Sequence, residues 1–347
     1  MIDWQRFKDK VDLNIFKRIF NDCLAVNDEK VLIIGDYGWQ NKVLSPILTN
    51  AYALAARELN LDYNVIIQNA KVRGDYADEV MVGALKRLPP NSVIVLNISN
   101  RIGKLVSIGS SFRKFCHKRN HKFITSSSLG SLSNEGIGHV LRTMDVDYKK
   151  MNARGERIKK ILDAGREVHI SSKIGTDLTM NITGVNSIVN SGKYTAPGAG
   201  GNLPAGEVYL YPVKDKVQGQ FYIDGSMRLR DKTLLVRNPV KVEVEKGEIT
   251  NISNHYEGKL LQQTLEWAHR KAKHPWGIRK IAELGIGINP NAKLVGATII
   301  DEKMVGTVHI ANGSNAWFGG EIFSIIHLDH VLKNPIVRVD GRLLKII

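Results

Sequence analysis

The stretch Val31-Leu-Ile-Ile-Gly-Asp-Tyr-Gly38 opens the part of the chain that decides its fold. Its first four residues form a short apolar run, and a segment with helical periodicity follows at 43–59. Further apolar runs at 63–67 and 92–97 alternate with helical segments up to about residue 128. Parallel strands need crossover connections, which helices supply. We therefore predict an α/β N-terminal domain with a mostly parallel sheet and helices on both of its faces.

The first apolar run ends in two glycines, Gly35 and Gly38, which raises the question of a dinucleotide site. The fingerprint of such a site is GxGxxG, with an acidic residue at the end of the second strand. Here the glycine spacing differs, and the second run ends in Ile67-Gln-Asn. We predict a tight strand-to-helix turn and no cofactor-binding loop.

The sequence pattern changes at Gly165, a suitable C-cap for an amphipathic segment that begins at Tyr148. Short β-type runs dominate from 167 to 252. A helix is predicted from Leu260 to Lys273, continuing to about Ala282, with strands at 293–300 and 305–311. We predict two domains: residues 1–165, and a β-rich α+β domain over residues 166–347 that carries the metal site.

The composition is that of a globular chain, with 43% hydrophobic and 24% charged residues among 347. No apolar run reaches the roughly 20 residues that a bilayer span needs, and the N-terminus lacks a signal-peptide pattern. We expect a cytoplasmic protein without a membrane partner. The net charge of +15 raises the question of nucleic acid, but the basic residues are scattered and no recognition motif accompanies them, so nucleic acid is not an expected partner.

The two cysteines, Cys23 and Cys116, lie far apart in the sequence, so any metal must be held by His and carboxylates. The sharpest pattern of such residues is Ile325-Ile-His-Leu-Asp329, because residues two apart in a strand point to the same face. Each candidate alone also fits an ordinary role, such as a hydrogen-bonded core His or a turn carboxylate. Together they form an oxygen-rich set suited to divalent ions such as zinc, cobalt or manganese: Glu207, Glu283, Glu302, His309, His327 and Asp329.

Five ordered motifs in the C-terminal half resemble those of the thermophilic metallo-aminopeptidases of the aminopeptidase T and S type. The resemblance covers about residues 165–347. The motifs are Asn202-Leu-Pro-Ala-Gly-Glu-Val208, Glu283 with its Gly-rich follower, Asp301-Glu-Lys with Gly306-Thr-Val-His-Ile-Ala311, His327-Leu-Asp329, and Val339-Asp-Gly341.

This resemblance implies that the six candidate residues bind two divalent ions, with Glu283 as the bridging carboxylate and the catalytic residue. It also implies a hydrolase that releases N-terminal residues from short peptides by means of a metal-activated water, and a homodimer. Two features depart from the family. The stretch Asn312–Gly320 contains no Tyr, and Glu302 and His309 are separated by six residues.

A more distant resemblance is to the iron-dependent 2,5-dihydroxypyridine 5,6-dioxygenases, which share the fold and also end in a His-x-Asp pair. It implies one ferrous ion held by two His and one carboxylate, with open positions for oxygen and substrate. Those enzymes carry His at the position that matches Glu283, so Glu283 favours the hydrolase. A third alternative is a non-catalytic or nucleic-acid-associated protein on the same fold, which the missing Tyr and the positive charge favour.

Overall fold

The structure is a computed structural model that describes residues 11–109 and 111–346. Its contacts divide the chain into two compact units. Unit 1 runs to Lys149 and includes Gly192–Ala205, and unit 2 contains Lys150–Ser191 and the residues from Gly206 onward. The domain boundary expected after residue 165 stays a prediction. Among the described residues, no helix is long and apolar enough to cross a membrane.

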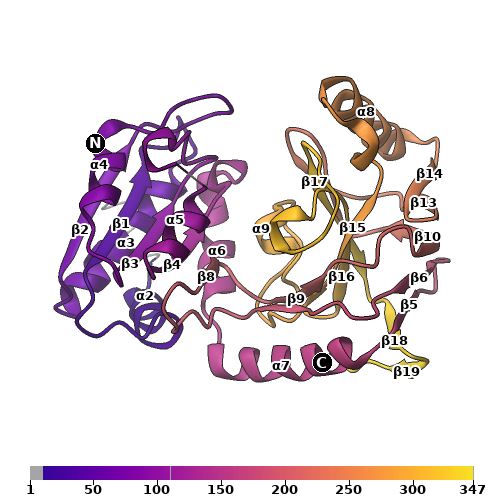
Figure 1. Ribbon diagram of the computed structural model, residues 1–347, viewed down its shortest axis with the longest axis horizontal. Coiled ribbons are helices and arrows are strands. Elements are labelled where there is room, and N and C mark those ends of the chain that lie inside the picture. Colours follow the sequence, from indigo (N-terminus) through magenta and orange to yellow (C-terminus); the bar gives the residue numbers. More distant parts are fainter. Residues whose placement is uncertain (1–10, 110, 347) are drawn as a thin grey trace. The chain divides into compact units, whose positions relative to one another are not determined.

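Unit 1 contains a five-stranded sheet in the order β2-β1-β3-β4-β8, and each neighbouring pair is parallel (Figure 1). Its strands are β1 (Val31–Asp36), β2 (Tyr63–Gln68), β3 (Val93–Asn97), β4 (Lys122–Ser126) and β8 (Gly200–Asn202). Its helices are α2 (Leu13–Arg18), the π-helical turn η1 (Ile19–Cys23), α3 (Leu44–Glu58), α4 (Glu79–Arg87), α5 (Phe112–Lys118) and α6 (Ile137–Met144), with 3-10 turns at Val106–Ile108, Leu129–Ser131 and Asn134–Gly136.

The apolar runs of β1 and β3 are buried throughout, as expected for strands covered on both faces. On one face, Leu32 and Ile94 pack in a cluster with Met81 of α4 and Phe115 of α5. Helix α3 contacts β1, β2 and β3, which accounts for the burial of alternate residues such as Ile33. The predicted α/β domain with a parallel sheet is confirmed.

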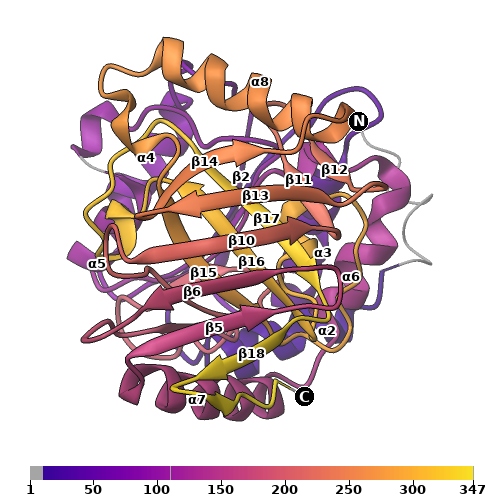
Figure 2. The same ribbon diagram turned by 90° about the vertical axis from the view of Figure 1, so that its right-hand side faces the viewer.

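Unit 2 contains two seven-stranded sheets in which the paired strands are antiparallel. Figure 2 shows most of the first sheet face on. That sheet has the order β14 (Glu248–Ile252), β13 (Val240–Glu245), β10 (Val217–Ile223), β6 (Asp177–Asn181), β5 (Glu167–Ser171), β18 (Ile336–Val339) and β19 (Arg342–Leu343).

The second sheet, called here the site sheet, carries the candidate residues on its central strands. Its order is β12 (Thr233–Leu235), β11 (Ser226–Arg228), β17 (His327–Lys333), β16 (Thr307–Gly313), β15 (Ile281–Gly287), β9 (Glu207–Leu210) and β7 (Ile188–Asn190). The helices are α7 (Tyr148–Ala164), α8 (Tyr256–Lys271) and α9 (Thr298–Asp301), with 3-10 turns at Pro275–Gly277 and Ala316–Phe318. The predicted β-rich character of this half is confirmed.

Two segments of unit 2 differ from the sequence prediction. The helix expected to continue to Ala282 ends at Lys271, because Pro275 has no N–H to donate and a 3-10 turn replaces the helix there. The strand expected at 293–300 is a loop that leads into α9. The carboxylate of Asp301 accepts hydrogen bonds from the backbone N–H groups of Val295 (2.7 Å) and Gly296 (3.1 Å), and these bonds take the place of strand pairing.

Candidate metal centre

The register of the site sheet brings the candidate side chains to one face. Residues directly opposite each other in antiparallel strands point to the same side. His309 of β16 lies opposite Gly285 of β15, and Ala311 of β16 lies opposite both Glu283 of β15 and Asp329 of β17. By the same register, Glu207 of β9 lies opposite Gly287, and His327 lies opposite Gly313. Five of the six candidates therefore share a face on four neighbouring strands.

Small residues on this face leave the space that the larger donors occupy. A Cβ atom at Gly285 would lie 1.9 Å from Nε2 of His309, and one at Gly287 would lie 2.0 Å from the carbonyl oxygen of Met304. Neither contact is sterically possible, so both positions require glycine. In the alternation Glu283-x-Gly285-x-Gly287, one carboxylate is therefore followed by two positions without a side chain on the same side of β15.

Glu283 is the central carboxylate, because each of its oxygens faces a different imidazole. Oε1 lies 3.2 Å from Nε2 of His309, and Oε2 lies 3.5 Å from Nε2 of His327. Nε2 of His327 also lies 3.1 Å from Oδ1 of Asp329, which confirms that the spacing of two in β17 places these side chains together.

His327 is oriented as a metal-binding imidazole must be. Its Nδ1 lies 2.8 Å from the carbonyl oxygen of Ser314. A carbonyl only accepts, so Nδ1–H is the donor and Nε2 is directed towards Glu283 and Asp329. Nδ1 of His309 is buried without a hydrogen-bond partner, although its Nε2 faces Glu283.

Two groups of potential ligand atoms occur among the described residues, and Glu283 belongs to both. The first is Glu207, Glu283 and His309, and the second is Glu283, His327 and Asp329; within each, the atoms lie within 4.8 Å of one another. The side chains are mostly buried, with His327 the most exposed at 22%. The structure therefore contains a buried Glu/His/Asp group that could bind a divalent metal ion. The number of ions stays a prediction, as does the role of each residue.

Burial and neighbouring charges shift the pKa values of these groups in different directions. Burial raises the pKa of Glu283, and the facing imidazoles only partly offset this. Burial lowers the pKa of each imidazole, but the carboxylates outweigh it and raise the pKa of His309 to about 9 and that of His327 to about 10. For Asp329, the charge on His327 outweighs burial and holds the pKa well below its usual range. A metal ion that bound these imidazoles near neutral pH would therefore have to displace protons from them.

Lys303 was not among the predicted site residues, but its side chain is fully buried beside Glu207 and Glu302. Its Nζ donates to Oε1 of Glu207 and to Oε1 of Glu302, each at 2.5 Å. Burial lowers the pKa of Lys303, but the two carboxylates outweigh this effect and raise it above the usual value. Lys303 lies between the strands predicted at 293–300 and 305–311, where a lysine is ordinarily solvated, and no pattern in the sequence signalled its burial.

Glu302 lies beside Lys303 and belongs to neither group of potential ligand atoms. Burial raises its pKa to about 8, although the ammonium of Lys303 opposes the shift. Glu207 is held differently, since Nδ2 of Asn190 also donates to its Oε1 at 2.9 Å. A metal-binding role for Glu302 stays a prediction.

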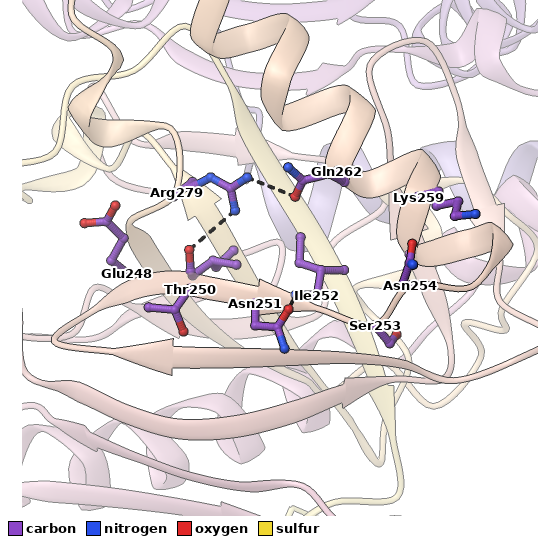
Figure 3. A pocket seen from close by; sticks show the side chains of 11 residues that line it. Glu248, Thr250, Asn251, Ile252, Ser253, Asn254, Lys259, Gln262 and Arg279 are labelled. Atoms are coloured by element: carbon purple, nitrogen blue, oxygen red, sulfur yellow. Dashed lines mark hydrogen bonds between the residues drawn. The ribbon is translucent and has the colours of Figure 1, made fainter.

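A separate pocket of about 600 Å³ lies between β14 and α8 (Figure 3). Arg279 lines it and donates to the carbonyl of Ile249 (3.4 Å) and to Oε1 of Gln262 (2.9 Å). Most of its described lining residues have polar side chains, and none of the six candidate residues is among them. Unlike the face of the site sheet, it has no imidazole and carboxylate side by side in that lining, so we do not place the chemistry there.

Comparison with protein families decides between the two resemblances. A family model described as 2,5-dihydroxypyridine 5,6-dioxygenase matches residues 12–345. The chain belongs to this dioxygenase family. Membership confirms that the protein is related to enzymes. It supports the resemblance to the dioxygenases, which was the more distant of the two when only the motifs were compared.

A characterised member of this family is only remotely similar to the chain in sequence. The 2,5-dihydroxypyridine 5,6-dioxygenase of Pseudomonas putida (strain KT2440) is 24% identical over 192 residues, which cover 52% of this chain and 53% of that protein. The match thus spans about half the length of this curated relative. The solved structure of the 2,5-dihydroxypyridine dioxygenase from Pseudomonas putida KT2440 superposes with a TM-score of 0.73 at 18% identity, covering 95% of this chain and 94% of that one. Wild-type AmpT from Thermus thermophilus gives a TM-score of 0.64 at 16% identity, covering 98% and 100%.

The family match shows that the prediction of an aminopeptidase was wrong, and with it the predictions of a hydrolase and of a metalloprotease. At 16% identity the likeness to AmpT shows the fold alone. The reason for the error lies in the site sheet: most of the motifs fall on β9, β15, β16 and β17, or on the turns that join them. These motifs are typical of the fold that the aminopeptidases and the dioxygenases share, and of the sheet face that carries the metal-ligand residue types. They do not specify the reaction.

Proposed function

We propose that the protein is a ring-cleaving dioxygenase that uses one ferrous ion and acts on 2,5-dihydroxypyridine or a closely related hydroxylated pyridine. The observation that carries the proposal is the group formed by Glu283, His327 and Asp329 in a chain matched by the dioxygenase family model from residue 12 to 345. The substrate class is transferred from the name of the Pseudomonas putida relative.

The donor set fits a hard or borderline divalent ion. His327 and Asp329 come from one strand and Glu283 from the strand two positions away, so they approach a common point from two sides. When bound there, a ferrous ion would supply the redox chemistry that joins dioxygen to the ring. Glu283, His327 and Asp329 would hold the ion, and their neighbours orient them: the carbonyl of Ser314 accepts from Nδ1–H of His327, and Nε2 of His309 lies 3.2 Å from Oε1 of Glu283.

With Glu283 in the ligand group, the group differs from the two-His, one-carboxylate pattern that the resemblance to the dioxygenases implies. Two carboxylates and one imidazole balance the charge of a divalent ion more completely than one carboxylate and two imidazoles do. This oxygen-rich set also suits Mn(II). We therefore infer that the centre binds Mn(II) as well as Fe(II), and that only Fe(II) supports ring cleavage.

The test is an anaerobic preparation loaded separately with Fe(II), Mn(II) or Zn(II), to which 2,5-dihydroxypyridine and oxygen are added. We expect oxygen uptake, loss of the pyridine absorbance and a product heavier by two oxygen atoms with Fe(II) alone. Catechol is the control for a ring without nitrogen. The other dihydroxypyridine isomers are assayed in the same way, and if the iron-loaded protein leaves every isomer intact, the proposed function is wrong.

A further inference from the structure

The face of the site sheet that carries the metal-donor residues also carries an arginine. Met227 of β11 pairs with His330 of β17, and both are fully buried. In this antiparallel register the next residue of β11, Arg228, lies opposite Asp329. Residues directly opposite each other point to the same side of a sheet, so the side chain of Arg228 shares the face of Asp329. Arg228 was not among the predicted site residues.

Arg228 is partly buried, yet it uses few of its hydrogen-bond donors. A guanidinium has five N–H donors. Within the described ranges, Arg228 makes one hydrogen bond, from Nη1 to Oγ1 of Thr233 at 3.4 Å, and no ion pair. None of its nitrogens is among the buried polar atoms that lack a partner in that part of the chain. The donors that the chain leaves unused are therefore accessible from outside the side-chain packing.

The charge of Arg228 is not neutralised by a carboxylate of its own. Burial lowers the pKa of Arg228, and the charges of Asp329, Asp231 and Glu302 oppose this shift. Each of these carboxylates is paired with another side chain at 3.3 Å or less. Because an arginine keeps its proton in proteins, Arg228 is a fixed positive charge beside the metal-donor group, and it is available to an anion.

An exposed aromatic ring borders the same donors. Trp317, in the 3-10 turn after β16, contacts His327 with ring centroids 4.8 Å apart and planes tilted by 50°. Phe318 also packs against the indole, at 4.6 Å between centroids. Trp317 is nevertheless 57% exposed, so part of its ring is free to pack against another flat ring. The surroundings of His327 and Asp329 therefore suit a ligand that is both aromatic and negatively charged.

We propose that Arg228 binds a negatively charged oxygen on the substrate ring, a carboxylate or an ionised hydroxyl, while Trp317 packs against the ring. This inference rests on the proposed function for the aromatic nature of the substrate, and it adds that the substrate binds as an anion. The planar fork of guanidinium donors matches the two oxygens of a carboxylate and also serves a single ionised oxygen. Arg228 thereby determines specificity, because a neutral ring leaves the guanidinium without a partner.

The experiment compares two probes of nearly the same shape, 5-hydroxynicotinate and its neutral amide, 5-hydroxynicotinamide. Their dissociation constants are measured by calorimetry on the whole protein loaded with Mn(II) under anaerobic conditions, so that no turnover is needed. We expect wild type to bind the carboxylate at least roughly tenfold more tightly than the amide, and Arg228→Gln to lose this preference. Binding of the amide should not change.

Two further variants separate the charge from its surroundings. Arg230→Gln is the matched control, because Arg230 has a half-exposed side chain and lies over the ring of Trp267, 4.4 Å from its centroid; it should keep the preference of wild type. Trp317→Leu should weaken both probes by the same factor, about 2–10-fold, and leave the preference for the carboxylate intact.

The compound 2,5-dihydroxypyridine, which has no carboxylate, distinguishes the two sources of the negative oxygen. If an ionised hydroxyl is the group that Arg228 binds, Arg228→Gln weakens binding of this compound by roughly tenfold as well. If a carboxylate is required, only 5-hydroxynicotinate is affected. Both results support the inference, and they assign the substrate to one source or the other.

The inference is overturned if Arg228→Gln changes the binding of neither anion, if it weakens the amide as much as the anions, or if wild type binds none of the probes. Circular dichroism and Mn content check that each variant folds and is loaded. Should Arg228→Gln not fold, Arg228→Lys decides, because it keeps the charge but not the fork of donors, and an unchanged preference would overturn the inference. Selective binding of the anions without ring cleavage by the iron-loaded protein would keep this inference and reject the proposed function.

Discussion

Two pairs of buried carboxylates lie near one another in unit 2, and they differ in what faces them. Glu283 and Asp329 face imidazoles, whereas Glu207 and Glu302 share an ammonium. Glu207 is intermediate, because its Oε2 also lies 3.7 Å from Nε2 of His309. An imidazole can exchange its proton for a metal ion, but an ammonium with a raised pKa remains a competing cation. A count of ligand-type residues therefore sets only an upper limit on the number of metal ligands, because the group that faces each carboxylate affects whether that carboxylate is free to bind an ion.

The largest expected effect separates the two pairs directly. Asp329→Asn removes a charged donor at nearly constant shape. Loss of a ligand's partner alone lowers metal affinity by about 10–100-fold, so loss of this ligand should lower it by at least roughly 100-fold. Affinity is measured by competition with a chelator. The control is His255→Ala, which breaks a similar pair, His255–Glu257 (3.2 Å), away from the site sheet. An equal loss of metal affinity in both variants would show that Asp329 is not a metal ligand.

The second prediction concerns the space on the face of the site sheet. Gly285→Ala would place a Cβ 1.9 Å from Nε2 of His309 and push the imidazole away from Glu283. We expect a loss of metal affinity of roughly 10-fold and a loss of stability of about 1–3 kcal/mol, measured by chelator competition and chemical denaturation.

The matched control for that variant is Gly138→Ala in α6, where a Cβ would meet open space. It should leave metal affinity unchanged and keep or raise stability by up to about 1 kcal/mol. Unchanged affinity in Gly285→Ala would show that the position of His309 does not matter to the centre.

The third prediction follows from the raised pKa values of His309 (about 9) and His327 (about 10). Below these pH values a metal ion must displace a proton from the imidazole that it binds. The apparent affinity should therefore rise about tenfold for each pH unit between pH 6 and 8 for each proton released. Titration calorimetry in buffers of different ionisation enthalpy counts the protons, and an affinity that is flat over this range contradicts the assignment of His327 as a ligand.

The smallest effect is expected on the side of the ammonium. Asn190→Ala removes the amide that donates to Glu207 at 2.9 Å. We expect a loss of stability of about 1 kcal/mol and a change in metal affinity below about threefold, which is less than the effect of losing a partner of a true ligand. A loss of metal affinity as large as that for Asp329→Asn would indicate that Glu207 is a metal ligand. The two pairs of carboxylates would then not differ in metal binding.

Much of the fold could be predicted because it depends on local patterns. The alternation of apolar runs and helical segments after Val31 gave the parallel sheet of unit 1, and the predicted helix from Tyr148 corresponds to α7. The failures occurred where tertiary contacts override the pattern. The apolar segment 293–300 is a loop and a short helix because the Asp301 carboxylate binds its backbone, a contact that apolar periodicity does not report.

The site was predictable to different degrees along its strands. His327 and Asp329 lie together because a strand repeats every two residues, and the glycines after Glu283 mark a face that must stay open. Lys303 was not predictable, since a lysine in a turn is ordinarily solvated and its carboxylate partner Glu207 is 96 residues away in the sequence. The short motifs identified the donor residues because they belong to a scaffold that several enzymes share. For the same reason they did not identify the reaction, and the aminopeptidase prediction was wrong. The family was identified only by the match over residues 12–345.

The class of each domain and the set of ligand-type side chains were therefore accessible from the sequence alone. These properties follow from composition and from the periods of strands and helices, which are local. Only the tertiary structure decided which of those side chains meet an imidazole and which meet an ammonium. The physical reason is that the strands β9, β15 and β17 and the turn after α9 are distant in sequence, and a buried charge takes its chemistry from whichever neighbour the fold brings to it.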